Sequence, residues 1–299
     1  MKLMTIQLGI SHTFDLDLTL CCGQAFRWDK KCDWWYGAVG DTVLKVRQRR
    51  DRLEFENADE DFVREYFGLN DDLSEILSQI NKDKHIEVAI NQFKGLRILR
   101  QDPWECLISY ICATYKNIAA IKRMLLRLSS KFGKRIILDG HTFFTFPTPA
   151  KLVKASSREL MDCELGYRAR YVCETARKVW RDGHELEGLK KMSYGQAKEE
   201  LLGFSGVGEK VADCVLLFSL EKLDAFPVDV WIRRAVIRHY AGRFPREFVE
   251  RISCEKSLSR SEYRRLNLFG REYFGKYAGY AQEYLYHHER THSRLQFMT

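Results

Sequence analysis

The chain has 299 residues, with 49 Lys and Arg against 41 Asp and Glu, which gives a net charge of +8 at pH 7. Its hydrophobic content of 45% is ordinary for a globular protein. No stretch of the sequence is apolar enough to span a bilayer, which argues against a membrane protein. The positive charge is compatible with a polyanionic partner, because Lys and Arg displace counterions from phosphates.

The N-terminal residues contain no long apolar core and do not resemble a signal peptide, so we expect a cytoplasmic protein. None of the nine cysteines forms a C-x-x-C pair. We therefore expect no zinc site, and no structural disulfides in a reducing compartment.

Residues 1 to about 58 predict a small antiparallel sheet. Aromatic and β-branched residues gather in residues 34–36, 42–47 and 52–56, with a Gly40-Asp41 turn between the first two stretches.

From about residue 60 the apolar spacing becomes helical, and Asp102-Pro103 with Glu105 predicts a helix start with a capping box. Further helices are predicted at about residues 117–131, 157–163, 168–181, 195–202, 209–219, 230–240 and 261–287. The sequence thus predicts an α+β protein, with an N-terminal antiparallel sheet domain with helices (1–97) packed on a mostly helical region (98–299).

The most informative stretch is a predicted helix-hairpin-helix at about residues 195–219. Gly206 and Gly208 separate its two helices, and we expect both glycines to be needed for the tight turn. Free N–H groups at the start of the second helix suit a DNA phosphate and would position the backbone without reading bases. A plain helix–helix turn is the alternative.

Lys210 stands at the start of the second helix, where the helix dipole disfavours a protonated amine. We expect burial to add to this effect and to favour the neutral, nucleophilic amine. Cys214 follows four residues later and shares a face with Lys210. Asp229 lies 19 residues downstream and opens the next predicted helix. Taken singly, Lys210 is more simply a surface lysine and Asp229 a helix cap.

Six ordered motifs resemble those of the 8-oxoguanine DNA glycosylases, bifunctional N-glycosylase/lyases of the helix-hairpin-helix superfamily. They are GQAFRW (23–28), RQDPWECL (100–107), LGYRARY (165–171), GVGEKVADC (206–214), PVDV (227–230) and YAGYAQ (277–282). The resemblance covers nearly the whole chain. It implies excision of 8-oxoguanine from duplex DNA by base flipping, a Schiff base on Lys210 and β-elimination, with Asp229 stabilising the sugar cation.

The resemblance also implies a pocket for the flipped base. The Gly23 carbonyl would accept a hydrogen bond from N7–H of 8-oxoguanine, which guanine lacks, and Gln282 would bond the Watson–Crick edge. Cys214 and Tyr286 would stack on the ring, where the family has Phe in place of Tyr286. Pro227 completes the implied pocket.

The expected DNA contacts come from several segments of the chain. They are Tyr115, Asn117, Tyr167, Arg168, Gly206, Gly208, Val211 and Trp231. Tyr115 replaces a gap-filling Asn of the family, and Ala120 replaces an Arg that reads the orphaned cytosine. We therefore expect relaxed discrimination of the opposite base, with Arg168 as the remaining reader. Together with Trp231 in place of a family His, these departures indicate a prokaryotic, nucleoid-associated member.

The resemblance implies no catalytic cofactor and no iron–sulfur cluster, since only Cys254 follows Cys214. The carbonyls of Leu202, Phe204 and Val207 are candidates for a structural monovalent or calcium ion. Duplex DNA with 8-oxoguanine is the expected partner, and we expect a monomer. A glycosylase for other damaged purines and a non-catalytic DNA-binding protein are the alternatives.

Overall fold

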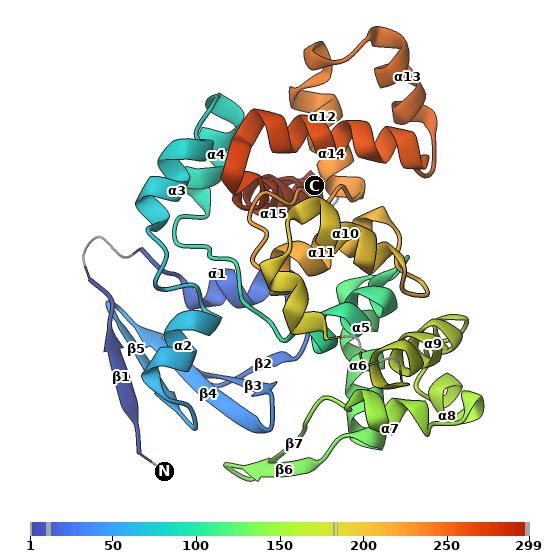
Figure 1. Cartoon of the computed structure of the whole chain (residues 1–299). Coiled ribbons are helices and arrows are strands. Elements are labelled where there is room, and N and C mark those ends of the chain that lie inside the picture. The colour runs from blue at the N-terminus through green and yellow to red at the C-terminus, as the bar shows by residue number, and fades with distance from the viewer. Residues whose placement is uncertain (1, 10–12, 182, 184, 297–299) are drawn as a thin grey trace.

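The computed structural model describes residues 2–9, 13–181, 183 and 185–296. A five-stranded antiparallel sheet, with strand order β1-β5-β4-β3-β2, lies at one side of the molecule (Figure 1). Its strands are β1 (Met4–Gln7), β2 (Trp28–Lys31), β3 (Trp34–Val39), β4 (Thr42–Arg49) and β5 (Arg52–Glu56). The predicted sheet and its Gly40 turn are thus confirmed, and Leu53 and Phe55 are both fully buried on its inner face.

Two short helices, α1 (Leu16–Cys21) and α2 (Glu60–Tyr66), pack against this sheet and close a first hydrophobic core. A two-stranded hairpin, which the sequence did not predict, connects the sheet to the helical body. This hairpin comprises β6 (Arg135–Leu138) and β7 (His141–Phe144). Phe143 stacks on Tyr36 at 5.5 Å between ring centroids, and Asp139 pairs with Lys45 at 2.8 Å.

The remaining helices form the body, with a second and larger core. Helices α3 (Leu73–Ile80) and α4 (Lys84–Gln92) pack beside the C-terminal helix α15 (Ala278–Gln296) in Figure 1. The other helices are α5 (Pro103–Ala113), α6 (Ile118–Phe132), α7 (Pro149–Val153), α8 (Ser157–Asp162), α9 (Arg168–Arg181), α10 (Tyr194–Leu202), α11 (Glu209–Ser219), α12 (Val230–His239), α13 (Arg246–Cys254) and α14 (Arg260–Phe274). In the described part of the chain, none of the helices has the length and apolar character of a membrane span.

Two local predictions were wrong. The helix expected at residues 261–287 is two helices, because Gly275 ends α14 with a φ of 74° and the chain turns before α15 begins. At α5, Asp102 caps the helix as expected by accepting the N–H of Glu105 at 2.8 Å. The Glu105 side chain, however, does not complete a capping box, since it pairs with Arg27 at 2.7 Å. This pair connects the residue just before β2 to the first turn of α5 in the helical body.

Candidate active site

The helix-hairpin-helix consists of α10, a glycine-containing turn and α11. Gly206 has a φ of 78°, and a Cβ atom at this position would lie 2.6 Å from the ring of Tyr171. Gly208 has an ordinary φ of −99° and open space around it, so the expectation that both glycines are sterically required was wrong. Only Gly206 needs to be glycine for the turn to form.

Helix α9 supports the hairpin along one face. The hydroxyl of Thr175 donates to the carbonyl of Ser205 at 3.2 Å, and the Lys178 ammonium donates to the carbonyl of Gly203 at 2.9 Å. Tyr171 contacts Gly206 on the same face, since these α9 residues recur at helical spacing. The hairpin is therefore fixed by packing and hydrogen bonds to α9.

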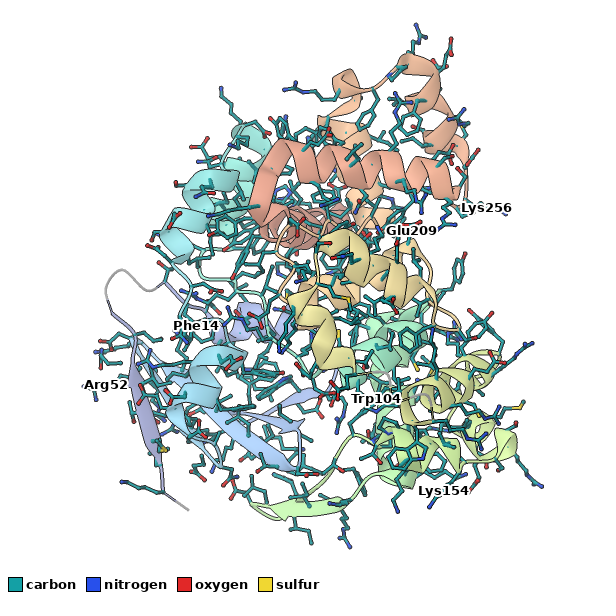
Figure 2. The ribbon with its side chains drawn as sticks, in the orientation of Figure 1. Phe14, Arg52, Trp104, Lys154, Glu209 and Lys256 are labelled. Atoms are coloured by element: carbon teal, nitrogen blue, oxygen red, sulfur yellow. The ribbon has the colours of Figure 1, made fainter. Side chains whose placement is uncertain are left out.

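Lys210 is the second residue of α11 and is exposed, so the expectation of a buried amine was wrong for the free protein. The neighbouring Glu209, labelled in Figure 2, does not neutralise it. The Glu209 carboxylate is occupied by Lys198 at 3.1 Å and by two arginines, Arg260 and Arg264, at 2.7 Å each. Within the described part of the chain Lys210 has no ion pair, and its charge acts on Cys214 and Asp229.

The apolar face of α11 is buried as predicted, with Val211, Cys214, Val215 and Phe218 each less than a tenth exposed. Burial raises the pKa of the Cys214 thiol, although the charge of Lys210 opposes this effect. The thiol is therefore neutral at pH 7, which fits a group that stacks on a base and does not attack it.

Asp229 caps α12 and accepts the N–H groups of Trp231 and Ile232, both at 2.9 Å. Desolvation raises the pKa of the Asp229 carboxyl, and the charge of Lys210 with these two N–H groups partly offsets the rise. The positive charge of Lys210 thus acts on the Asp229 carboxyl, although no direct ion pair joins the two side chains in the described part of the chain.

A buried network around Asp213 connects the helix of Lys210 to the loop of Asp229. Asp213 is fully buried in α11 and pairs with Lys198 at 2.8 Å. Tyr263 donates to Asp213 at 2.7 Å and accepts the N–H of Val228 at 3.2 Å. Asn267 donates both to Asp213, at 3.1 Å, and to the Phe226 carbonyl at 2.9 Å. The loop that contains the buried Pro227 is thereby held against α11.

Gly23, near the N-terminus, lies beside Tyr286 of the C-terminal helix α15. Gln282 precedes Tyr286 by one turn of the same helix. Gly23 has a φ of 110°, and a Cβ atom there would lie 3.3 Å from the hydroxyl of Tyr286. Gln24 holds this segment in place, since its side chain donates to the carbonyl of Arg97 at 2.8 Å. Gln282 is buried, and its Oε1 atom has no hydrogen-bond partner in the described part of the chain. An unpaired buried acceptor is costly unless a ligand satisfies it.

Three other predicted DNA contacts lie at or near the N-terminus of α9. Tyr115 is 85% exposed with a φ of 53°, and Tyr167 is also exposed. Arg168 is instead buried, where it donates to the carbonyls of Thr114 and Leu165. Arg168 therefore holds the segment before Tyr115 in this structure.

The two remaining contacts have local roles in the structure. The Asn117 side chain caps α6 by accepting the N–H of Ala120 at 2.9 Å. Trp231 is half-buried, and the guanidinium of Arg234 lies 4.9 Å from its ring centroid.

Sequence reasoning missed two buried charged residues of α15, Glu283 next to Gln282 and Arg290 bonded to Tyr286. Burial raises the pKa of the Glu283 carboxyl to about 7, and Arg290 opposes the rise. The sequence did contain a clue to Arg290. It follows Tyr286 by four residues, and this spacing on one helix places the two side chains side by side.

Two family models match the chain in succession. Residues 7–107 match the 8-oxoguanine DNA glycosylase N-terminal domain, and residues 108–253 match the HhH-GPD superfamily base excision DNA repair proteins. With the hairpin, the exposed Lys210 and Asp229 at the N-cap of α12, these matches define a base-excision DNA glycosylase of the helix-hairpin-helix superfamily.

Individual relatives narrow this class. The chain is 32% identical to the N-glycosylase/DNA lyase of Saccharomyces cerevisiae, over 90% of this chain and 82% of that protein. The structure of MBOgg1 in complex with a low-affinity DNA ligand superposes with a TM-score of 0.86 at 32% identity, over 98% of this chain and all of that one. The 8-oxoguanine glycosylase/lyase of Clostridium acetobutylicum, bound to DNA with cytosine opposite 8-oxoguanine, gives 0.84 at 32% identity over 94% and 93%. The chain belongs to the N-glycosylase/DNA lyase family of 8-oxoguanine DNA glycosylases.

Proposed function

We propose that this protein excises 8-oxoguanine from duplex DNA and then cleaves the abasic strand, with Lys210 as the nucleophile and Asp229 as its partner. The observation that carries the proposal is the placement of a free lysine amine and a desolvated carboxylate at the starts of two helices, α11 and α12. Family membership, which argues against a non-catalytic DNA-binding protein, supports the same assignment.

Lys210 would attack C1′ of the damaged nucleoside, and the C1′–N9 bond would break as the base leaves. The amine nitrogen now bonded to C1′ loses a proton, and the C1′–O4′ bond breaks as O4′ takes up a proton, which gives an open-chain Schiff base. Removal of a C2′ proton then breaks the C3′–O3′ bond by β-elimination, and the strand is cleaved on the 3′ side with the phosphate as the leaving group. Because only a neutral amine attacks, DNA that covers the exposed Lys210 would favour the reactive form by excluding water. Asp229 would stabilise positive charge on the sugar as it develops.

The flipped base would be read by Gly23 and Gln282, with Cys214 and Tyr286 against its faces and Pro227 at the edge. The unpaired Oε1 of Gln282 supports this role, because an N–H group of the base would satisfy it. The positive φ of Gly23 supports a backbone that is shaped for a ligand.

Duplex DNA would lie across the hairpin N–H groups of Gly206, Gly208 and Val211, with Tyr115, Asn117, Tyr167 and Trp231 as further contacts. Arg168 would act from inside the protein, by holding the Thr114 carbonyl next to Tyr115. A structural monovalent or calcium ion at the hairpin carbonyls is part of the proposal. The Leu202 and Val207 carbonyls accept no hydrogen bond among the described backbone contacts, and carbonyl oxygens suit such ions. With Phe204 they would hold an ion that stabilises phosphate binding, without a catalytic role. We expect a monomer that acts in the nucleoid.

Borohydride trapping tests the proposed function. Wild-type protein mixed with duplex DNA that contains 8-oxoguanine should form a covalent complex with borohydride, and Lys210→Gln should form none. Excision measured across a panel of oxidised and alkylated purines then tests the substrate. A faster reaction on an alkylated purine, without strand cleavage, would contradict the proposal and favour a glycosylase for other damaged purines.

A further inference from the structure

Arg290 is a buried arginine of α15 that touches both sides of the candidate base pocket. It is 7% exposed, and one of its terminal nitrogens donates to the carbonyl of Cys21 at 3.0 Å. Its other terminal nitrogen donates to the hydroxyl of Tyr286 at 3.1 Å. The guanidinium also lies 5.1 Å from the centroid of the Tyr286 ring. One side chain thus binds both the end of α1, just before Gly23, and the Tyr286 side chain of α15.

The same guanidinium group also fills the space beside Gly23. A Cβ atom at Gly23 would lie 2.8 Å from the same Arg290 nitrogen that bonds Tyr286. A side chain at this position would collide with the guanidinium, so Arg290 can pack here only because residue 23 is glycine.

Neighbouring charges favour this buried cation. Glu283, one residue beyond Gln282, and Asp229 both interact with Arg290 electrostatically. His287 lies 3.2 Å from the Arg290 nitrogen that bonds the Cys21 carbonyl. An arginine with these bonds offers several donors in a rigid plane, so it holds its partners at fixed positions.

We propose that Arg290 is a positioning residue that sets base selectivity by holding the Gly23 backbone and the Tyr286 ring in register with each other. This inference rests on the proposed function, in which Gly23 accepts a hydrogen bond from the lesion and Tyr286 stacks on it. The Tyr286 hydroxyl accepts the hydrogen bond of Arg290 and so connects the Tyr286 ring to the segment around Gly23. A Phe at this position would lack this hydroxyl.

The test compares two reactions of the full-length protein. Single-turnover excision of 8-oxoguanine needs the base pocket, whereas borohydride trapping on a duplex with a preformed abasic site needs only Lys210. Arg290→Met should slow excision by about tenfold, or ~1.4 kcal/mol, and leave abasic-site trapping within about twofold. The ratio of 8-oxoguanine to guanine excision should fall as well, which a purely structural role would not produce.

Tyr286→Phe serves as a second variant, because it keeps the ring and removes only the acceptor for Arg290. Its effect should be smaller and should not add to that of Arg290→Met in the double variant. Arg243→Met is the matched control, since Arg243 stacks on Tyr273 at 5.2 Å away from the pocket. It should leave both reactions unchanged.

The outcomes separate the two hypotheses. Wild-type protein that traps on abasic DNA but excises no 8-oxoguanine overturns the proposed function, and the inference with it. Wild-type excision that Arg290→Met leaves unchanged overturns the inference alone. Equal loss of both reactions in Arg290→Met, with additive effects of Tyr286→Phe, also overturns it, because Arg290 would then act on stability and not on the pocket.

Discussion

The hydroxyl of Tyr263 donates to Asp213 at 2.7 Å and accepts the N–H of Val228 at 3.2 Å. This single side chain connects helix α11, which contains Lys210, to the loop that leads into Asp229. The two candidate catalytic residues are 19 residues apart in the sequence and stand at the starts of two different helices, so this buried link helps to set their relative position.

Tyr263→Phe should destabilise the protein by about 1–3 kcal/mol, because it leaves the Asp213 carboxylate and the Val228 N–H short of a buried partner. It should also slow excision and abasic-site trapping together. Urea unfolding and single-turnover kinetics measure the two effects. Tyr277→Phe is the control, since the Tyr277 hydroxyl has no hydrogen bond among the described contacts. A Tyr263→Phe protein as stable and active as wild type would refute the link.

Asp229→Asn should keep the cap of α12, since Asn caps helices about as well as Asp, and lose about 10²- to 10⁴-fold in excision rate. Because desolvation raises the pKa of the Asp229 carboxyl, activity that needs the ionised form should fall at a higher pH than for an ordinary Asp. The acid limb of the pH–rate profile reports this pKa. An unaltered rate in Asp229→Asn would exclude a catalytic carboxylate.

Gly206→Ala should weaken binding to undamaged duplex DNA and destabilise the protein by about 1–3 kcal/mol, because a non-Gly residue is strained at a φ of 78° and its Cβ would meet the Tyr171 ring. Gly208→Ala is the matched variant, with an ordinary φ and open space around it. Fluorescence anisotropy and thermal unfolding compare them. Equal effects of the two changes would contradict the assigned roles.

Excision opposite C, A, G and T should differ by less than about fivefold, or about 1 kcal/mol. Ala120 has no donor for cytosine, and the Arg168 guanidinium donates to the carbonyls of Thr114 and Leu165 inside the protein. A bidentate arginine contact would instead supply about 1–3 kcal/mol of discrimination. Ala120→Arg should therefore create a preference for C, and a strong C preference in wild type would show that another residue reads this base.

Glu283→Gln should stabilise the protein above pH 7. Burial raises the pKa of Glu283 to about 7 in the folded state, from an ordinary value near 4.5. Between these two values the folded protein binds more protons than the unfolded chain, so its stability falls as the pH rises and stays lower above pH 7. The variant should remove on the order of 3 kcal/mol of this loss. Urea unfolding at pH 5 and pH 8 measures it, and a wild-type stability that is flat with pH would contradict it.

Much of the fold followed from local signals. The strands around residues 42–56 and the start of α5 were predicted because alternation, a Gly turn and an Asp-Pro cap act over a few residues. The break at Gly275 was not, because the apolar spacing of α14 continues into α15. The β6–β7 hairpin was also missed, since Phe143 is stabilised by Tyr36, a residue distant in sequence. The domain division at residue 97 stays a prediction.

The sequence by itself determined the family and the candidate residues Lys210 and Asp229, because the chemistry of a site requires particular residue types at a fixed spacing within each motif. Only the tertiary structure decided how these residues are held, because the contacts are long-range. Asp213, Tyr263 and Val228 meet through three different elements, and Arg290 reaches Cys21 across almost the whole chain. Spacing along a chain cannot show such contacts, since they form only when the core packs.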